Sequence, residues 1–381
     1  MKQTYLDNAS TTQIREEVIE VMTDILKNNF GNPSSTYSTG RSAKAVIETS
    51  RKQVAKYLNA TSQEIIFTSS ATEANNWILR NAVQNLKVQR IITSKIEHHA
   101  VLNTVLELQK EFGIEVDFVN LLENLSAEQA GGNINLNHLE ELLKDEKSTL
   151  VSLMYVNNET GNILDIQKVG ELCREHKAYF HSDTVQAIGK IPMDLQKLYI
   201  DFLIGTAHKF HGPKGIGFVF ARKGTPFKPL FFGGSQEKGI RAGTEAVHQI
   251  VGLAKALELS YDNLESEKEH IFSLRNYLIE QLNQNFKGYK INGDPNGIYN
   301  ILNVQFPFSE SVTPTILFTL DMKGIAVSRG SACQSGSLVP SHVLEEILPK
   351  QEINKPSIRI SLSHFNTKED VDRLIEALKG L

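Results

Sequence analysis

Residues 150–221 read LVSLMYVNNETGNILDIQKVGELCREHKAYFHSDTVQAIGKIPMDLQKLYIDFLIGTAHKFHGPKGIGFVFA, and short apolar runs alternate there with polar or amphipathic stretches. The apolar runs are strand-sized: LVSLMYV (150–156), AYFH (178–181), FLIG (202–205) and GFVFA (217–221). EIIFT (64–68) and RIIT (90–93) continue the pattern upstream, and each precedes a helix-like stretch. Continuously apolar strands that alternate with helices predict an α/β domain with a largely parallel sheet.

The C-terminal part of the chain has a different pattern. A long helical pattern covers 247–286 and leads into an α+β arrangement. The expected strands and helices there are 301–306, 315–322, 325–328, 358–362 and a last helix from Thr367, where TKED matches a capping pattern, to Leu381. With 381 residues and about 150 residues per domain, we expect a large domain over 15–257. A small domain would combine 1–14 with 258–381.

Composition excludes several broad classes. The chain has 40 basic and 44 acidic residues and a net charge of −4, so we expect no broad contact with nucleic acid, although a local tRNA contact stays open. No apolar run approaches the roughly 18 residues of a membrane helix, and no signal-peptide pattern opens the sequence. The two cysteines, Cys173 and Cys333, are far apart, which argues against disulfides or a cysteine zinc site and favours a reducing cytoplasm.

Common nucleotide and hydrolase motifs are absent from the sequence. It contains no GxxxxGK[ST], no GxGxxG after a strand, no HExxH and no GxSxG. Nucleotide hydrolysis, dinucleotide redox chemistry, zinc proteolysis and α/β-hydrolase chemistry therefore lack their usual sequence support.

Polar side chains follow two of the expected strands. Asp183 and Gln186 follow AYFH, and His208 and Lys209 follow FLIG. Because ligands of parallel sheets bind at the carboxyl ends of the strands, an aspartate and a lysine there are placed to share a pocket. A lysine that binds pyridoxal 5′-phosphate (PLP) as a Schiff base needs an acid partner for the pyridinium nitrogen. A surface lysine and a helix-capping aspartate are the ordinary alternative.

The start of one expected helix suits an anion. Ala71 and Thr72 lie where EIIFT gives way to a helix, and the free N–H groups and dipole of such a helix start attract phosphate. The alternative is that Thr72 is an ordinary N-cap with Glu73 in the first turn. The two roles are compatible.

Collinear segments that span nearly the whole chain carry a family resemblance. They are YLDNASTT (5–12), GNPSSTYSTG (31–40), FTSSATEANN (67–76), SKIEHHAVLNT (94–104), YVNNETGNILDI (155–166), HSDTVQAIGKIPMDL (181–195), AHKFHGPKGIGFVF (207–220), IRAGTEAVHQIVG (240–252), SRGSACQSGSLVPSHVL (328–344) and SIRISLS (357–363). Together they resemble the cysteine desulfurases of the NifS/IscS group, which are class V aminotransferase-like enzymes of PLP fold type I. The resemblance implies that the fold is α/β in the aspartate aminotransferase manner, with PLP bound to the large domain.

The resemblance also implies roles for individual residues. Lys209 would carry the cofactor as a Schiff base and act in catalysis, and Asp183 would bind the pyridinium nitrogen. His98 would stack on the ring and take part in catalysis, whereas the adjacent His99 points elsewhere. The remaining implied cofactor contacts are Gln186 and Asn158 at the ring hydroxyl, and Ala71, Thr72, Thr206, His208 and Thr244 of the partner subunit at the phosphate.

The substrate contacts come from the same comparison. Arg359, in SIRIS, matches the arginine that binds the substrate carboxylate, and an arginine fork suits a carboxylate. An inter-domain salt bridge is the alternative role for that arginine. Asn32 and Asn158 would lie near the same carboxylate. The substrate would be L-cysteine and the product L-alanine, made by a homodimer that binds no metal.

Cys333 is the other expected reaction centre. Its surroundings are rich in Ser and Gly, which predicts an exposed, mobile loop. The resemblance makes Cys333 the nucleophile that forms a persulfide, which then passes to an acceptor protein such as an iron–sulfur scaffold or a tRNA-thiolating enzyme. Cys173 shares a helix face with apolar residues, so we expect it to be structural.

Three alternatives remain at this point. The chain could be a selenocysteine lyase or an aminotransferase of the same fold. It could be a scaffold that only binds sulfur-carrier partners. It could also be a protein without PLP whose metal site uses His98, His99, His181, His208, His211 and Asp183, because HxD and HxxH spacings permit shared ligation.

Overall fold

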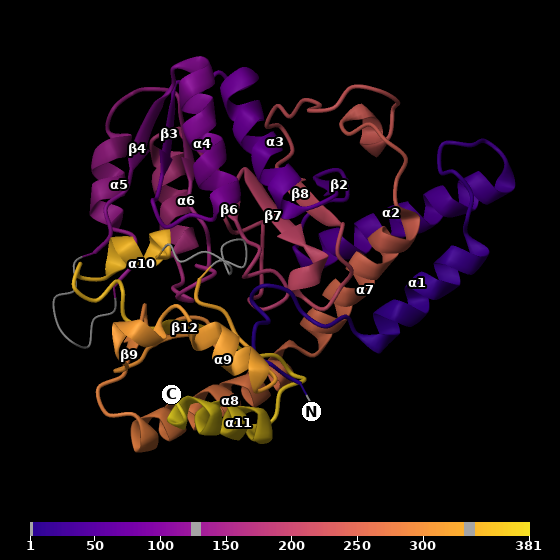
Figure 1. Cartoon of the computed structure of the whole chain (residues 1–381). Helices are drawn as coiled ribbons and strands as arrows, with labels where there is room; N and C mark the ends of the chain where they lie inside the picture. The colour runs from indigo at the N-terminus through magenta and orange to yellow at the C-terminus, as the bar shows by residue number, and fades with distance from the viewer. Residues whose placement is uncertain (1–2, 123–130, 331–339) are drawn as a thin grey trace.

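The computed structural model describes residues 3–122, 131–330 and 340–381. A seven-stranded sheet forms the centre of the molecule (Figure 1). Its strand order is β2 (Ile65–Thr68), β8 (Gly217–Ala221), β7 (Phe202–Thr206), β6 (Tyr179–Asp183), β5 (Thr149–Ser152), β3 (Arg90–Thr93) and β4 (Glu115–Phe118). The strands from β7 to β4 are parallel, and only β8 runs antiparallel to its neighbours β7 and β2. The expected α/β fold with a mostly parallel sheet is confirmed. The strand β4 was not expected from the sequence.

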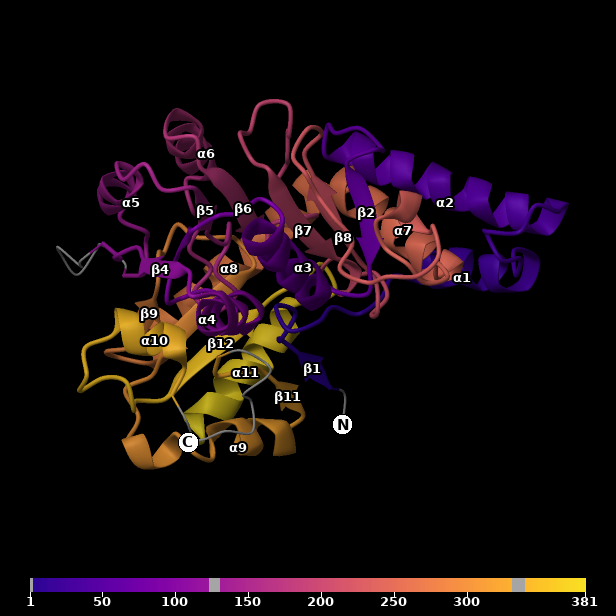
Figure 2. The same ribbon diagram turned by 90° about the horizontal axis from the view of Figure 1, so that it is seen from above.

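Helices cover both faces of this sheet (Figures 1 and 2). They are α1 (Glu16–Asn28), α2 (Ser38–Tyr57), α3 (Ala71–Gln84), α4 (His99–Phe112), α5 (Leu136–Leu143), α6 (Ile166–Glu175) and α7 (Val247–Asp262). Neighbouring residues of one strand pack on opposite sides, because side chains alternate along a strand. Ile66 and Val219 pack with α3, whereas Ile65 and Phe218 pack in the core that α2 and α7 share. Burial on both faces explains why these strands are apolar throughout.

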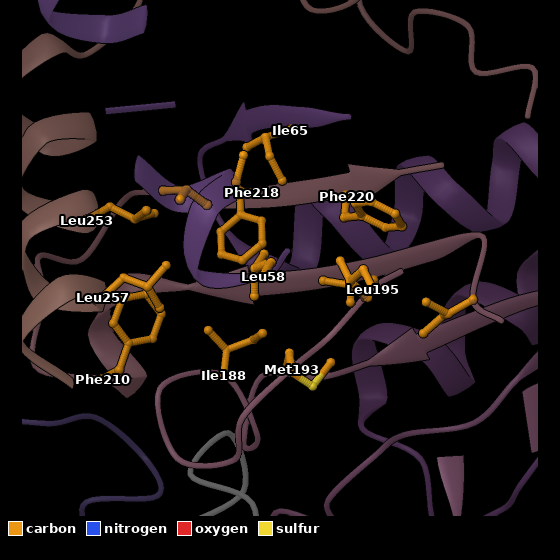
Figure 3. Packing of buried hydrophobic residues seen from close by; sticks show 14 of the residues in the cluster. Leu58, Ile65, Ile188, Met193, Leu195, Phe210, Phe218, Phe220, Leu253 and Leu257 are labelled. Carbon is orange, nitrogen blue, oxygen red and sulfur yellow. The ribbon is translucent and has the colours of Figure 1, made fainter. Parts of the chain in front are cut away.

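Large side chains fill the core beneath the sheet. Phe218 and Ile65 project toward Leu58 and Leu257, beside Phe210 (Figure 3). All five are at most 1 % exposed. This packing holds the segment after β7, which carries Lys209, against the helical layer.

A second group of elements lies below the sheet in Figure 1. It contains α8 (Leu264–Asn285), β9 (Lys290–Asn292), β10 (Ile301–Gln305), α9 (Ile316–Met322), β11 (Ile325–Ala326), α10 (His342–Ile347), β12 (Ser357–Ser361) and α11 (Lys368–Lys379). An antiparallel sheet, β12-β10-β9, packs with α8 and α11 around a core of its own. The expected capping box is present at Thr367, with Asp370 as its partner.

The N-terminus joins this second group. β1 (Thr4–Tyr5) pairs in parallel with β11, and the Thr4 hydroxyl donates to Oδ1 of Asp370 at 3.2 Å. The division into 15–257 and 1–14 with 258–381 stays our proposal for the domain boundaries.

The connection between the two groups differs from the sequence expectation. One long helix was expected over 247–286, but Asn263 separates α7 from α8. Its backbone leaves helical values at φ −101° and ψ 7°, and its side-chain amide donates to the carbonyl of Leu259. An asparagine that binds its own helix in this way offers the backbone an alternative to continued helix. No helix in the described ranges is long and apolar enough to cross a membrane.

Candidate active site

A cavity of about 220 Å³ lies at the carboxyl ends of the central strands. Its walls come from the segments that follow β2, β3, β5, β6 and β7, which is where open α/β sheets bind ligands. The residues expected at the site that line this cavity are Ala71, Thr72, His98, Asn158, Asp183, Gln186, Thr206, His208, Lys209 and Arg359. Residues from both groups of elements therefore meet at one place.

Asp183 ends β6 and is held by two donors. The side-chain amide of Asn75 donates to its Oδ2 at 2.8 Å, and the backbone N–H of Val185 donates to its Oδ1 at 3.0 Å. Asp183 is 5 % exposed and Asn75 is fully buried. The sequence reasoning missed Asn75, although a polar residue on the apolar face of α3, between Ala74 and Ile78, was a usable signal. The carboxylate is therefore fixed in orientation before any ligand binds.

Lys209 lies in a short turn directly after β7 and points at the N-terminal segment. Its Nζ donates to the backbone carbonyls of Ala9 and Ser10, both at 2.7 Å. The N–H of Thr12 donates to the carbonyl of His208 at 2.9 Å, which ties the same segment to the lysine turn. Ala9 and Ser10 thus form one wall of the site, and Thr11 and Thr12 fasten that wall to His208. The sequence reasoning gave residues 9–12 no role at the site.

His98 is the N-cap of α4 and presents a neutral ring. Its Nδ1 accepts the N–H of Ala100 at 3.1 Å, which fixes the ring orientation. Burial is the largest influence on its pKa and lowers it, whereas the charge of Asp183 acts in the opposite direction. The ring of His99 packs against His342, with 4.3 Å between the ring centroids. Only His98 of this adjacent pair lines the cavity.

The start of α3 supplies free backbone donors. The first backbone bond of the helix runs from the N–H of Ala74 to the carbonyl of Ser70. The N–H groups of Ala71 and Thr72 come before it and have no partner within the helix. The N-cap is Ser70, whose hydroxyl accepts the N–H of Glu73 at 3.2 Å. The alternative that Thr72 caps the helix is therefore wrong. Ser70 is the capping side chain because it precedes the first helical residue, and this leaves Thr72 inside the first turn at the cavity wall.

Two polar side chains near that helix start have protein partners. The Thr206 hydroxyl donates to the carbonyl of Ile216 at 3.0 Å, and Nδ1 of His208 lies 3.2 Å from the hydroxyl of Thr11. Burial, and next the charge of Lys209, lower the pKa of His208 to about 3. His208 is therefore a neutral hydrogen-bonding group at neutral pH.

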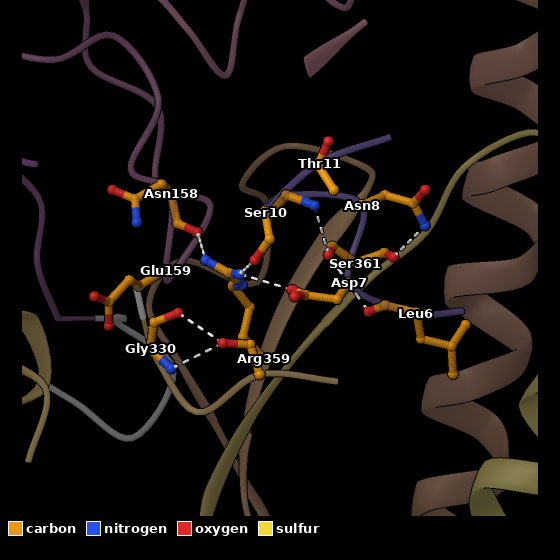
Figure 4. A network of polar contacts seen from close by, with 12 residues as sticks. Leu6, Asp7, Asn8, Ser10, Thr11, Asn158, Glu159, Gly330, Arg359 and Ser361 are labelled. Atoms are coloured by element: carbon orange, nitrogen blue, oxygen red, sulfur yellow. Dashed lines mark hydrogen bonds and ion pairs between the residues drawn. The ribbon is translucent and has the colours of Figure 1, made fainter. Parts of the chain in front are cut away.

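Arg359, in β12, brings the second group of elements to the cavity. It is 1 % exposed, and its guanidinium points at three groups (Figure 4). Nη1 donates to the carbonyl of Asn158 at 2.9 Å, and Nη2 donates to Oδ1 of Asp7 at 2.7 Å and to the hydroxyl of Ser10 at 2.6 Å. A salt bridge, the alternative role, is thus present with Asp7, but both residues belong to the proposed small domain, and the contact with the proposed large domain is the hydrogen bond to Asn158. The salt bridge places the guanidinium at the cavity wall rather than away from it.

Three expected site residues are not part of this cavity as the structure describes it. Asn32 is exposed, and its side-chain oxygen accepts the N–H of Ser34 at 2.9 Å. Thr244 is also exposed, away from the cavity of its own chain. Cys333 lies outside the described residues. Cys173 is buried, and burial raises the pKa of its thiol, so a structural role fits it.

The metal-site alternative does not match the geometry. Over the described ranges, no group of three or more His, Cys, Asp or Glu side chains lies close enough to hold a metal ion. Nδ1 of His181 lies 2.9 Å from the Ser152 hydroxyl inside the sheet, and His211 binds the carbonyl of Gln13. The six residues in question therefore serve different local contacts.

The donor set fits PLP. A lysine amine that can bind an aldehyde, a buried carboxylate for a ring nitrogen and a helix start for a phosphate line the same cavity. The Asn75 amide and the Val185 N–H keep the carboxylate in place, as a cation partner requires.

Comparison with known proteins places the chain in a family. The family model "Aminotransferase class-V" matches residues 4–374. The chain therefore belongs to the class V aminotransferases. A curated relative, "Cysteine desulfurase IscS" of Methanosarcina thermophila, is 43 % identical over 99 % of this chain and 91 % of its own length. Within the family the chain belongs to the cysteine desulfurases, which are PLP-dependent enzymes.

Solved structures agree with this assignment. A "NIFS-LIKE PROTEIN" has a TM-score of 0.89 and 36 % identity, covering 100 % of this chain and 99 % of that one. A structure described as "SspA in complex with cysteine" has a TM-score of 0.81 and 31 % identity, covering 96 % of this chain and 100 % of that one.

Proposed function

We propose that this chain removes the sulfur atom of L-cysteine and releases L-alanine, with PLP held by the cavity residues. The observation that supports this most is that Lys209, Asp183 and Arg359 line a single cavity of about 220 Å³. These groups match the three needs of an amino-acid substrate on this cofactor: an amine for the aldehyde, an anion for the ring and a cation for the carboxylate.

The cavity residues would hold the cofactor by its three polar parts. Bound PLP withdraws electrons from the substrate carbon as long as its ring nitrogen keeps a proton. Asp183 would stabilise that proton, and the neutral ring of His98 would lie against the cofactor ring. The ring hydroxyl would contact Gln186 and Asn158. The expected phosphate contacts are Ala71, Thr72, Thr206, His208 and Thr244 of the partner subunit.

Lys209 and Arg359 would act on the substrate itself. The Lys209 amine, once the substrate amine has taken its place, would remove the proton from Cα as a general base. Arg359 would bind the substrate carboxylate in exchange for part of its present contacts with Asp7 and Ser10. Asn32 and Asn158 would lie beside that carboxylate.

Cys333 would receive the sulfur. Its thiolate attacks the sulfur atom of the substrate, an S–S bond forms and the substrate C–S bond breaks. The electron pair of that bond goes to the substrate carbon, which takes a proton and becomes the methyl group of L-alanine. The persulfide on Cys333 then carries the sulfur without any added oxidant.

The partners follow from this chemistry. We propose a homodimer in which Thr244 of the partner subunit would complete the phosphate site, as the family resemblance implies; Thr244 is exposed and does not line the cavity of its own chain. We also propose a sulfur-acceptor protein that takes the persulfide. An iron–sulfur scaffold or a tRNA-thiolating enzyme suits that role. We place the enzyme in the cytoplasm, since a reducing compartment keeps thiols free for transfer.

Mass spectrometry of Cys333 tests the proposal. The PLP-loaded protein is exposed briefly to L-cysteine, and alanine is quantified in the same tube. We expect one added sulfur atom on Cys333 together with matching alanine, and neither product from the Lys209→Ala variant. Alanine without added mass on Cys333 would refute the persulfide role. Faster turnover of selenocysteine than of cysteine would favour the lyase alternative.

A further inference from the structure

A second lysine approaches the site from the turn after β6. Gly189 in this turn has φ +76°, and a Cβ atom there would lie 2.8 Å from Cβ of Phe210. Both the backbone conformation and the space require glycine. The turn can therefore press against the segment that follows Lys209. As a result, Lys190 and Lys209 line one small second cavity.

Gln186 connects the two lysines. Nζ of Lys190 donates to Oε1 of Gln186 at 3.4 Å, and Nε2 of Gln186 donates to the carbonyl of Ala9 at 2.9 Å. The same carbonyl accepts from Nζ of Lys209 at 2.7 Å. Because Gln186 is 2 % exposed, this chain of hydrogen bonds lies inside the protein. A donor at position 190 fixes which end of the Gln186 amide points at Ala9.

The surroundings of Lys190 do not favour a second positive charge. Burial, and next the charge of Lys209, lower the pKa of Lys190 to about 7. The titratable groups around it are Lys209, His208, His211, Tyr261, Glu267 and Tyr299. Glu267 is bound by Arg15 through two contacts of 2.7 and 2.8 Å. The negative charge of Glu267 is therefore already paired with Arg15.

We propose that Lys190 is a positioning residue for Lys209, acting through Gln186 and through its own positive charge. The inference rests on the proposed role of Lys209 as cofactor lysine and base. Like charges close together repel, so a protonated Lys190 disfavours a proton on Lys209 or on its linkage to the cofactor. A base must be free of its proton to act. Below about pH 7, where Lys190 keeps its proton, its charge would therefore lower the pH at which Lys209 becomes available.

The test is a pH titration of the visible absorbance of the PLP-loaded enzyme, without any amino acid. This absorbance reports the proton on the linkage between Lys209 and PLP. In Lys190→Met we expect the midpoint to rise by up to about one pH unit, the order of effect of one full neighbouring charge, because Lys190 carries its charge only in part near pH 7. In Lys190→Arg the charge persists at every pH, so the midpoint should stay at or below that of the unmodified enzyme.

The matched control is Lys197→Met, which removes an exposed positive charge from the same stretch of chain; the Lys197 side chain is 82 % exposed. Its midpoint should not move. An unchanged midpoint in Lys190→Met would overturn the proposal. If Lys190→Met does not bind PLP, the Lys190→Arg variant supplies the test. A midpoint raised above that of the unmodified enzyme in Lys190→Arg would also overturn the proposal. The titration needs no substrate, so its result is independent of whether the enzyme desulfurates cysteine.

Discussion

Replacing Asp183 by asparagine removes one negative charge from the base of the cavity and changes little else. The carboxylate is 5 % exposed and is held by Asn75 and by the N–H of Val185. Oδ1 of Asn75 has no hydrogen-bond partner among the described residues. A rotation of that amide can therefore accept a new N–H donor at position 183, and we expect the variant to fold and bind PLP.

The expected loss of activity follows from leaving a buried cation unpaired. Removing one partner of a buried ion pair costs about 3–5 kcal/mol, and each 1.36 kcal/mol is tenfold in rate. If the charge on the ring nitrogen is needed in full in the transition state, kcat for alanine formation should fall by about 10²- to 10⁴-fold.

The assay is alanine formation from L-cysteine at saturating substrate, with PLP content measured in parallel. Loading the variant with a PLP analogue methylated at the ring nitrogen supplies a permanent positive charge, which needs no carboxylate to keep a proton. We expect this analogue to recover part of the lost rate. Asp372→Asn, a change at an exposed position on α11, is the control. A kcat of Asp183→Asn within threefold of the unmodified enzyme would refute the reasoning.

Three further results are expected. Glu237→Ala should lower the free energy of unfolding by about 3 kcal/mol, because the buried guanidinium of Arg51 loses its partner at 2.6 Å and keeps only Glu48 at 3.2 Å as a carboxylate partner; a loss below 1 kcal/mol in urea unfolding would contradict this. In His181→Asn the free energy of unfolding should fall less steeply as the pH is lowered than it does in the unmodified protein. Burial lowers the pKa of His181 to about 4, so the unfolded chain binds a proton more readily below about pH 6.5, and stability is lost as pH falls toward 4. Between pH 7.5 and 5 this single group should account for about 2 kcal/mol, and equal losses in both proteins would disprove it. Arg359→Lys should raise KM for cysteine by about 10- to 100-fold, the worth of one hydrogen bond to a charged group, with kcat changed less; an unchanged KM would remove Arg359 from the substrate site.

The sequence predicted the parts of the site that local patterns encode. Asp183, His208 and Lys209 follow apolar runs that are long enough only for strands, and the strand ends of a parallel sheet share one edge. Their presence at one cavity could therefore be inferred before the structure. The capping box at Thr367 was likewise a local signal, since its two members are three residues apart.

The tertiary structure decided which distant residues support these groups. Asn75 reaches Asp183 across 108 positions of sequence, and Ala9 meets Lys209 across 200. Such contacts depend on how helices and termini pack on the sheet, and no periodicity along the chain records them. The antiparallel direction of β8 belongs to the same class, because strand direction is set by the packing of remote segments. The sequence by itself thus determined the chemistry at the strand ends, and tertiary packing decided the orientation in which that chemistry is held.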